Sequence, residues 1–359
     1  MKIAAHLVMG LAGVHLADVE AAFIEHHHPA GIILFSRNIE NPQQVLKLVQ
    51  QIRAAVKLAS PPTIWIDQEG GRVQRLRDPF IRYPSPWQFS QLPAEKGVFL
   101  SGLGGELLGM ELAALGIGVD CAPVLDIQEL GADPVIGARA FGADPATVIS
   151  LAGAWLAGLA SSGVMGVGKH FPGHGAASAD SHKSLPIIEK SAEELAAWEL
   201  KPFLALLPKL PALMTAHLIA AGLDPEQPAT QSKLILDGVL RKQWGYQGLI
   251  VSDALEMGAL SGSLADRARL AVGAGCDLVL CCTGLLPDSQ EVLQGIEDAV
   301  SSFGEQMSAS RARISKELQP YRIEPQGLDS LEGNKKYRDG RLLLEWLAEK
   351  KFSIDPTEQ

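Results

Sequence analysis

The chain has 359 residues, of which 47% are hydrophobic and only 20% are charged. These proportions exclude an intrinsically disordered chain, and the length excludes a small module held together by disulfides. Because 41 acidic side chains outnumber 31 basic ones and the net charge is −10, nucleic acid is not expected as a partner, since proteins bind it by neutralising phosphates.

The first 17 residues pair one lysine with an apolar stretch. We interpret them as the first strand and its loop rather than a secretory leader, because His6 and His15 interrupt the stretch. No apolar run approaches the roughly 18 residues of a membrane span, so no such span is expected. The cysteines lie in apolar runs without C-x-x-C spacing, which predicts buried free thiols in a reducing compartment. They are Cys121, Cys276, Cys281 and Cys282.

Short apolar runs rich in β-forming residues recur along the chain, separated by segments with helical period. In chain order these runs cover residues 6–10, 31–35, 63–67, 118–126, 167–171, 212–217, 248–253 and 277–281. Strands that alternate with helices form a parallel sheet buried on both faces. Eight such units predict an α/β protein folded as a closed (β/α)8 TIM barrel.

Several of the intervening helices have recognisable N-terminal signals. Asn41 and Asp144 each directly precede a proline, which favours a capped helix start. Ser191 and Glu194 have the spacing of a capping box, and Ser232 precedes a fourth amphipathic segment. These signals place helices after the second, fourth, fifth and sixth strands.

An open doubly wound sheet is the main alternative fold, and it requires a phosphate-binding fingerprint after its first strand. Gly102, Gly104 and Gly105 lie in a helical segment and lack the third glycine of that fingerprint. Residues 163–169 spell G-x-x-x-x-G-K, but His170 stands where a P-loop needs Ser or Thr. Neither segment therefore predicts a nucleotide site.

The sequence predicts a catalytic barrel over residues 1–318, followed by a linker and a helical tail over residues 319–359. The tail contains a cluster of apolar residues that predicts one terminal helix docked on the flank of the barrel. They are Leu342, Leu343, Leu344, Trp346 and Leu347. The tail is too short to be a second domain.

In barrels of this type the active site is built at the carboxyl ends of the strands. Ionisable residues collect at several of these ends. They are Asp67, Glu69, Arg72 and Arg75 after the third strand, Asp126 and Arg139 after the fourth, Lys169, His170 and His174 at the fifth, His217 at the sixth and Asp253 at the seventh. Each residue alone is explained by a cap or an ion pair. The whole set is costly to desolvate unless a ligand or a mutual network uses it.

The histidines raise the question of a metal. His170, His174, His182 and His217 are candidate ligands, but metal-dependent barrel hydrolases usually take an H-x-H pair from the first strand, which here offers only His6. We therefore expect neither a metal nor any other cofactor.

The loop that begins at Pro172 is rich in glycine and alanine, and it ends in Asp180-Ser-His182. A carboxylate two residues from an imidazole can orient the ring and favour its protonated form. Asp253, on a rigid strand end, would stay ionised beside Lys169, Arg75 or Arg139. A flexible acid/base and a fixed carboxylate indicate covalent catalysis in two steps.

Four sequence elements at these strand ends form a recognisable set. They are K-H-F-P-G-H-G at 169–175 followed by D-S-H at 180–182, I-D-Q-E-G-G-R-V at 66–73, A-P-V-L-D at 122–126 and I-V-S-D at 250–253. Together they resemble the glycoside hydrolase family 3 β-N-acetylglucosaminidases, over residues 7–282. The first element separates this branch from family 3 β-glucosidases, which take their acid/base from a second domain.

The resemblance implies a retaining hydrolase, a β-N-acetylhexosaminidase, in which Asp253 is the nucleophile and forms a covalent glycosyl-enzyme intermediate. It implies that His182 is the acid/base, assisted by Asp180. It also implies a set of residues that hold the sugar hydroxyls and the acetamido group. They are Asp67, Arg75, Arg139, Lys169 and His170.

The short form resembles the cytoplasmic enzyme of bacterial cell-wall recycling, which removes N-acetylglucosamine from GlcNAc-1,6-anhydro-MurNAc muropeptides. This likeness implies a small carbohydrate substrate, a cytoplasmic location, and a role in cell-wall biogenesis and thereby in cell shape and division. We expect a monomer rather than an oligomer, and no nucleic-acid or membrane partner.

Three positions depart from the family pattern. The first strand ends in the stretch Met9–Gly13, where many members carry an acidic D-x-E-G; Ala138 precedes Arg139 where a polar residue is common, and Ala254 follows Asp253 where a second Asp is frequent. Two alternatives stay open: a related β-glycosidase, such as a β-glucosidase or β-xylosidase, and a non-catalytic sugar-binding barrel. The presence of both Asp253 and the Asp180/His182 pair argues against the second.

Overall fold

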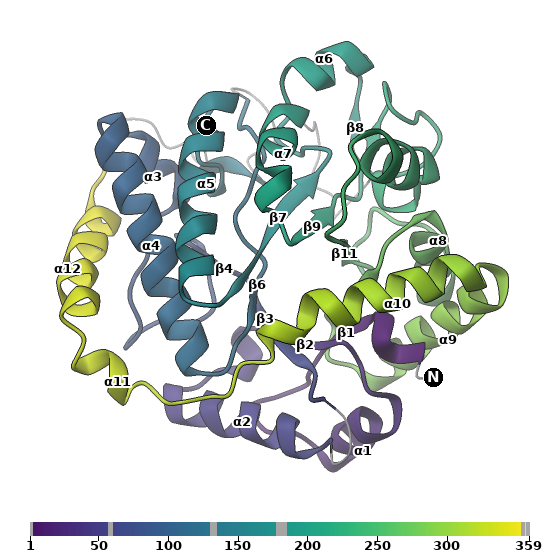
Figure 1. Cartoon of the computed structure of the whole chain (residues 1–359), viewed down its shortest axis with the longest axis horizontal. Coiled ribbons are helices and arrows are strands. Elements are labelled where there is room, and N and C mark those ends of the chain that lie inside the picture. The colour runs from purple at the N-terminus through teal and green to yellow at the C-terminus, as the bar shows by residue number, and fades with distance from the viewer. Residues whose placement is uncertain (1–2, 57–59, 130–134, 177–184, 353–355, 357–359) are drawn as a thin grey trace.

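A computed structural model shows a closed barrel of eight parallel strands (Figure 1). It describes the chain except residues 1–2, 57–59, 130–134, 177–184, 353–355 and 357–359. The barrel strands are β1 (Leu7–Gly10), β2 (Gly31–Leu34), β3 (Thr63–Ile66), β6 (Val119–Asp120), β7 (Met165–Phe171), β9 (Ala212–Thr215), β11 (Leu249–Ala254) and β12 (Leu278–Cys281). Their order around the barrel is β1-β12-β11-β9-β7-β6-β3-β2. The predicted (β/α)8 barrel is confirmed.

A helical segment follows each strand and packs on the outside of the barrel. These segments are α1 (Asp18–His27), α2 (Pro42–Ala54), α4 (Ala94–Ala114), α5 (Pro145–Ser161), α6 (Ala192–Ala197) with α7 (Leu200–Leu206), a π-helical segment (Leu234–Gln243), α8 (Leu264–Ala274) and α9 (Leu286–Ser302). The predicted caps are confirmed at three helix starts. Asn41 accepts from the Gln44 N–H and Asp144 accepts from the Thr147 N–H, and Ser191 forms the predicted capping box. Ser232 Oγ accepts from the Ile235 N–H at the fourth start.

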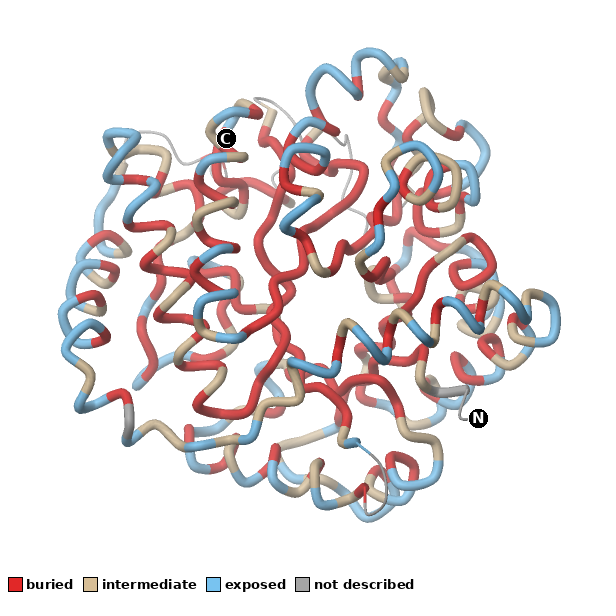
Figure 2. The backbone as a smooth tube through the Cα atoms, viewed as in Figure 1, coloured by how far each residue is buried: buried red, intermediate tan, exposed pale blue. Residues whose placement is uncertain are grey.

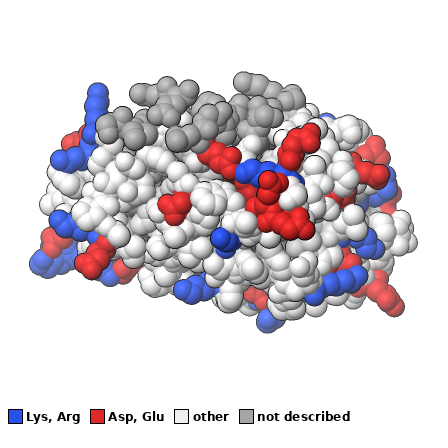
Figure 3. Space-filling view, turned by 90° about the horizontal axis from the view of Figure 1, so that it is seen from above, with Lys and Arg blue, Asp and Glu red and all other residues white. Residues whose placement is uncertain are grey.

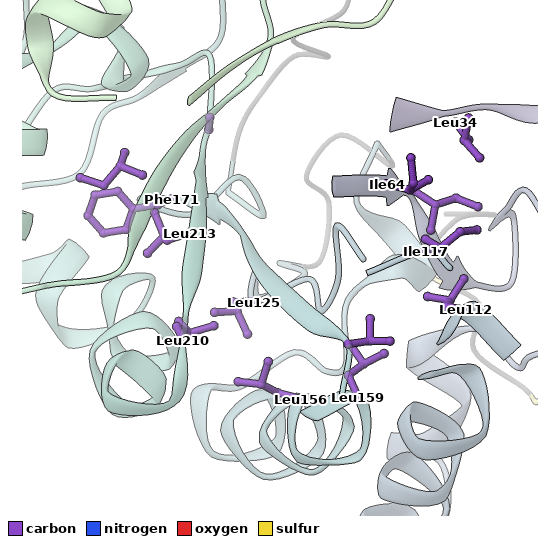
Figure 4. Packing of buried hydrophobic residues seen from close by; sticks show 14 of the residues in the cluster. Leu34, Ile64, Leu112, Ile117, Leu125, Leu156, Leu159, Phe171, Leu210 and Leu213 are labelled. Carbon is purple, nitrogen blue, oxygen red and sulfur yellow. The ribbon is translucent and has the colours of Figure 1, made fainter. Parts of the chain in front are cut away.

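Alternation along each strand divides the apolar core into two layers. Val8, Ile33 and Trp65 belong to a cluster inside the barrel, whereas their neighbours, such as Leu34 and Ile64, belong to the layer between strands and helices. Figure 2 shows the strands buried throughout. Figure 4 shows the outer layer, where leucines of the surrounding helices meet the strands. The four cysteines are buried and unpaired, as predicted.

The fourth strand is shorter than its predicted range of 118–126. Only Val119 and Asp120 belong to β6, because Pro123 has no N–H to give to a sheet ladder. Val124 makes one isolated bridge to Lys169, and Asp126 lies beyond it, fully buried. The strand prediction was wrong at this end. The irregular backbone places Asp126 next to His170 of β7.

After the eighth strand and α9, the chain covers the amino-terminal end of the barrel. Helix α10 (Gly304–Leu318) crosses the amino-terminal end of the strands (Figure 1), where Ile314 and Leu318 join the inner cluster. A short helix, α11 (Asp329–Glu332), then leads to α12 (Lys335–Glu349), which packs on α4. The division of the chain at residue 318 remains a prediction.

Helix α12 uses only part of the apolar cluster that suggested its docking. Leu344 and Leu347 are buried, and Tyr337 Oη donates to Glu111 Oε1 of α4 over 2.5 Å. Leu342, Leu343 and Trp346 are exposed. The predicted terminal helix therefore docks through only part of the cluster, because consecutive residues of a helix cannot share one narrow face.

Helix α4 is the one helix in the described part of the chain that is long and apolar enough to span a membrane. Its most apolar window has a mean hydropathy of 1.2, and 67% of that window is buried within the protein. It packs against α5 and α12, so its apolar residues belong to the core of the helical layer. Acidic and basic side chains are mixed on the face shown in Figure 3, without a continuous basic surface.

Helices α4 and α5 approach so closely that glycine is required at their crossing. A Cβ atom at Gly105 would lie 2.1 Å from the Trp155 carbonyl oxygen, whereas at Gly102 the nearest atom would be 3.6 Å away. Gly105→Ala should therefore destabilise the protein by about 1–3 kcal/mol. Gly102→Ala, the matched control on the same helix, should be neutral or stabilise it by about 0.5–1 kcal/mol. Urea unfolding of both variants measures the difference, and equal effects would contradict this packing.

Candidate active site

A cavity of about 640 Å³ opens at the carboxyl ends of the barrel strands. Six of the predicted site residues line it. They are Asp67, Arg75, Arg139, Lys169, His170 and Asp253. The structure thus brings together side chains from β3, β7, β11 and the loop before α5. Asp180 and His182 lie outside the described residues.

A small hairpin after β3 turns the predicted strand end back toward the cavity. Strand β4 (Gln68–Gly70) pairs with β5 (Val73–Gln74) in an antiparallel ladder, which the sequence analysis did not anticipate. Gly71, with φ of 55°, makes the turn in a backbone region that favours glycine. The buried amide of Gln68 fixes the hairpin, because its Oε1 accepts from the Arg75 N–H over 2.7 Å. Glu69, Val73 and Arg75 consequently line the cavity.

Glu69 is the centre of a buried ion network. Its Oε1 lies 2.6 Å from Lys169 Nζ, and its two oxygens accept from Arg139 Nη2 and Nε, each over 2.8 Å. Lys169 Nζ also donates to Asp67 Oδ1 over 2.8 Å. Arg75 Nη2 lies 3.4 Å from Asp67 Oδ2 and is the last member of this ion network. The network joins the β4–β5 hairpin, β7 and the loop before α5 in one rigid wall.

The charges in this wall stabilise each other. Burial alone would raise the pKa of Glu69, but Arg139 and Lys169 outweigh it and hold the pKa well below its ordinary value. Burial alone would lower the pKa of Lys169, but Asp67 and Glu69 hold it above its ordinary value. Both residues therefore stay charged across the physiological pH range.

His170 is oriented by the buried carboxylate of Asp126. Its Nδ1 lies 2.6 Å from Asp126 Oδ2, and its Nε2 lies 3.4 Å from Arg139 Nη2. Asp126 Oδ1 also accepts from the His174 N–H over 2.7 Å. Burial would raise the pKa of Asp126, but the contacts with His170 and His174 lower it. Asp126 thus anchors the start of the loop that leads to residues 177–184.

Lys169 and His170 are consecutive, yet both line the cavity. Neighbouring residues of a regular strand point to opposite faces. The register of β7 against β9 shifts between Gly168 and Phe171, and such an irregularity re-aims side chains at a barrel rim. The two side chains therefore reach one site from adjacent positions.

Asp253 lies at the end of β11 and differs from the carboxylates of the ion network. Its Oδ1 accepts from the Ala254 N–H over 2.8 Å, and it forms no ion pair within the described part of the chain. Burial would raise its pKa, but His170 and His217 lower it, and the Ala254 N–H and Lys169 add to this effect. The expectation of an ionised Asp253 agrees with this direction. Arg75 and Arg139, also expected to act on it, pair with Asp67 and Glu69 instead.

His217 contacts the backbone at the end of β11, next to Asp253. It is fully buried, its Nδ1 lies 2.8 Å from Thr230 Oγ1, and its Nε2 lies 2.9 Å from the Ala254 carbonyl oxygen. Burial lowers its pKa. With both ring nitrogens engaged, His217 positions the backbone that follows Asp253.

The sequence analysis did not select three cavity residues. Glu69 appeared in the strand-end run, and its spacing of two from Asp67 would place both carboxylates on one face of an extended segment, which is a usable signal. Arg37 after β2 and Glu256 after β11 also line the cavity. Glu256 Oε1 accepts from the Cys282 N–H over 2.9 Å. Burial raises its pKa. Nothing in the local sequence distinguishes these two from ordinary loop charges.

The departures from the family pattern lie beside or near residues of the cavity. A Cβ atom at Gly10 would lie 2.7 Å from Arg37 Nη2. Ala138 belongs to a 3-10 turn that carries Arg139, and Ala254 lines the cavity beside Asp253. Within the described ranges, no group of three His, Cys, Asp or Glu side chains has the arrangement of a metal site. The absence of a metal from the reaction remains a prediction.

Comparison with known proteins agrees with this geometry. Residues 4–318 match the glycosyl hydrolase family 3 N terminal domain. A beta-hexosaminidase of Alkalilimnicola ehrlichii is 43% identical over 284 residues, which cover 77% of this chain and 80% of that protein. A beta-hexosaminidase of Haemophilus influenzae is 41% identical, over 77% of this chain and 79% of that protein.

Solved structures give the same result. NagZ from Neisseria gonorrhoeae, in complex with N-trifluoroacetyl-D-glucosamine, superposes with a TM-score of 0.83 at 31% identity and covers 96% of this chain and 98% of that one. A family 3 β-N-acetylglucosaminidase from Paenibacillus superposes with a TM-score of 0.88 at 30% identity, over 99% of this chain and 70% of that one. The family match spans the barrel strands and the helices between them. The aligned region also covers most of the length of each of these relatives. The chain belongs to glycoside hydrolase family 3.

Proposed function

We propose that this protein is a retaining exo-β-N-acetylglucosaminidase that acts through a covalent glycosyl-Asp253 intermediate. That it is a hydrolase, a β-N-acetylhexosaminidase, follows from the family match and from the relatives named beta-hexosaminidase. The observation that carries the finer proposal is the contrast between Asp253 and the other cavity carboxylates. Asp253 is held ionised without an ion-pair partner in the described part of the chain, so its charge is available to a reacting carbon.

The neighbouring carboxylates are poorly placed for that role. Glu69 is occupied by Lys169 and Arg139, and Asp67 by Lys169 and Arg75. A nucleophile that must first break a buried ion pair would expose two charges at the moment of reaction. Attack by Asp253 requires no ion pair to break first, and the residue is held in place at the end of β11.

The reaction proceeds in two displacements. In the first, Asp253 attacks the anomeric carbon while the bond to the leaving oxygen breaks, and that oxygen takes a proton from the imidazolium of His182. In the second, the neutral imidazole takes a proton from water, which attacks the anomeric carbon and releases Asp253. Two inversions retain the β configuration. Asp180 orients the imidazole of His182 and favours its charged form.

The ion network supplies the binding wall for the sugar. Asp67, Arg75, Arg139, Lys169 and His170 line the same cavity as Asp253. Cations and carboxylates held rigidly by one another present donors and acceptors without losing side-chain entropy on binding. We assign these five residues to the sugar hydroxyls and the acetamido group.

The physiological substrate follows from the resemblance of the sequence to the enzymes of cell-wall recycling. We propose GlcNAc-1,6-anhydro-MurNAc muropeptides as the substrate, the cytoplasm as the location, a monomer as the active form, and the recycling that supports cell shape and division as the process. The four buried, unpaired cysteines support a reducing compartment.

The class of sugar is tested with a panel of nitrophenyl glycosides. The β-N-acetylglucosaminide should be hydrolysed in the presence of a chelator, because His182 and not a cation activates the water. Preference for the β-glucoside or β-xyloside would establish a different specificity, and binding without turnover of any substrate would establish a non-catalytic barrel. Loss of activity in chelator, restored by zinc, would contradict metal-independent hydrolysis.

The nucleophile is tested by substitution and by labelling. Asp253→Ala should abolish turnover and keep the fold, whereas Asp298→Ala, an exposed carboxylate of α9, should leave the rate unchanged. A slow fluorinated N-acetylglucosaminide should label Asp253 in a digest, and early proton spectra should show a β product. A label on Asp67 instead would move the nucleophile to that carboxylate.

The acid/base assignment predicts a dependence on the leaving group. His182→Ala should be strongly impaired on natural disaccharides, whose alkoxide needs a proton, and less impaired in glycosylation on nitrophenyl substrates, whose phenolate leaves unaided. Asp180→Ala should lose part of both activities. Added azide should restore turnover of the His182 variant on nitrophenyl substrates, because it attacks the intermediate without a base. Equal losses on both substrates without azide rescue would exclude His182 and direct attention to His174.

A further inference from the structure

Glu111 of α4 is a buried carboxylate that the proposed reaction does not use. Its Oε2 accepts from Tyr83 Oη over 2.9 Å. Its Oε1 accepts from the Ile81 N–H over 2.9 Å and from Tyr337 Oη over 2.5 Å. Burial raises the pKa of this carboxyl to about 7, although the three donors and Arg341 lower it. A carboxylate in such a place depends on each of its donors, because a buried acceptor left unpaired is costly.

The three donors come from two segments that are far apart in the sequence. Tyr337 belongs to α12, which lies beside α4 (Figure 1) and beyond residues 4–318, the part that matches the family domain. Ile81 and Tyr83 belong to residues 75–85, which contain no helix or strand. A segment without its own backbone ladders is positioned largely by such contacts. Glu111 and α12 therefore help to decide where this segment lies.

Helix α12 also contacts this part of the chain directly. Arg341 Nη1 donates to the Pro79 carbonyl oxygen over 2.9 Å. Gln88, in the short helix that follows the segment, donates through Nε2 to the Leu347 and Lys350 carbonyl oxygens over 2.8 and 2.9 Å. The segment is thus held against α12 near its middle and just after its end.

The same segment supports the β4–β5 hairpin. The Gly71 N–H donates to the Tyr83 carbonyl oxygen over 3.1 Å. Gln74 Nε2 donates to the Ile81 carbonyl oxygen over 2.7 Å, and Gln74 Oε1 accepts from the Tyr83 N–H over 3.2 Å. The fit is close, since a Cβ atom at Gly71 would lie 2.7 Å from the Ser85 Cβ atom. A shift of the segment would therefore displace the hairpin.

The hairpin carries two charged side chains of the cavity. Glu69 in β4 is the centre of the ion network, and Arg75 directly follows β5. A series of buried contacts, from Tyr337 through Glu111 and Tyr83, thus connects α12 with that network.

We propose that Tyr337 and Glu111 are positioning residues for sugar binding, through which α12 holds the β4–β5 hairpin in its binding geometry. This inference rests on the proposed function, because that function assigns the ion network to the sugar. Coupling between two sites is reciprocal, so sugar bound at the network in turn stabilises the docking of α12. A helix that only covers α4 would show no such response.

The reciprocal effect is measured by amide hydrogen exchange, with N-acetylglucosamine, the product of the proposed reaction, as the probe. Saturating sugar should slow exchange in α12 as well as in the hairpin. Exchange through local opening responds only where that opening is coupled to the sugar site. Helix α10, which crosses the opposite end of the barrel, is the internal control and should not respond.

The contact itself is tested by removing one hydroxyl. In Tyr337→Phe the sugar should no longer slow exchange in α12, and KM for the nitrophenyl β-N-acetylglucosaminide should rise about fivefold or more, the lower end of typical coupling. The kcat should change less, because Asp253 belongs to β11 and not to the hairpin. Glu111→Gln should have the same effects. Tyr321→Phe removes a tyrosine hydroxyl of the tail outside this cluster and should leave KM and the exchange response unchanged.

The outcomes separate this inference from the proposed function. Equal exchange in α12 with and without sugar, while the hairpin of the wild-type enzyme is protected, would overturn the role of α12 and leave the hydrolase assignment intact. An unchanged KM in both Tyr337→Phe and Glu111→Gln would overturn it as well. No turnover of any β-N-acetylglucosaminide would overturn the proposed function and this inference with it. Because the wild-type exchange is measured without any substitution, a variant that fails to fold does not remove the test.

Discussion

The site depends on one buried interaction, the contact of the Glu69 carboxylate with both Lys169 and Arg139. Each cation would be destabilised by burial alone, and removal of one partner from a buried ion pair typically costs about 3–5 kcal/mol. Glu69 is contributed by the β4–β5 hairpin, Lys169 by β7 and Arg139 by the loop before α5. The network therefore decides how three separate segments meet, and it gives the cavity its wall.

The barrel holds most of the proposed site residues on strands or through buried contacts. Asp253 and Lys169 belong to strands, and His170 is fixed by Asp126, so the groups proposed to hold the sugar and to attack it have little freedom. The proposed acid/base, His182, belongs to the segment between Ala176 and the short strand β8 (Ile187–Ile188), which pairs with β10 (Ile219–Ala220).

Ion pairs hold most of the cationic side chains of the cavity in place. In the network wall three cations, Lys169, Arg139 and Arg75, share the two carboxylates of Glu69 and Asp67. Arg37 binds the carbonyl oxygens of Leu11 and Cys282 and lies over the Phe35 ring, which Arg75 of the network also contacts. Small residues at Gly10 and Gly284 leave room for the Arg37 guanidinium.

Periodic and local information in the sequence determined the architecture. Eight apolar runs alternating with helical segments gave the barrel, because a strand buried on both faces needs apolar side chains in every position. The caps at Asn41, Asp144 and Ser191 depend on neighbours within three residues, so they were predictable. The strand ends also placed Asp67, Lys169, His170 and Asp253 at one rim, since parallel strands end on the same side.

Only the tertiary structure decided which of these groups interact. The pairing of Glu69 with Lys169 and Arg139 joins residues as far as 100 positions apart, and no local pattern specifies it. The short β6 and the shifted register of β7 arise where a proline and a bulge interrupt the ladders. The space for the Arg37 guanidinium depends on Gly10 and Gly284, which meet it through the closure of the barrel. A sequence determines periodicity and local hydrogen bonds, but the partners of a buried charge are set by which strand ends the closed barrel brings together.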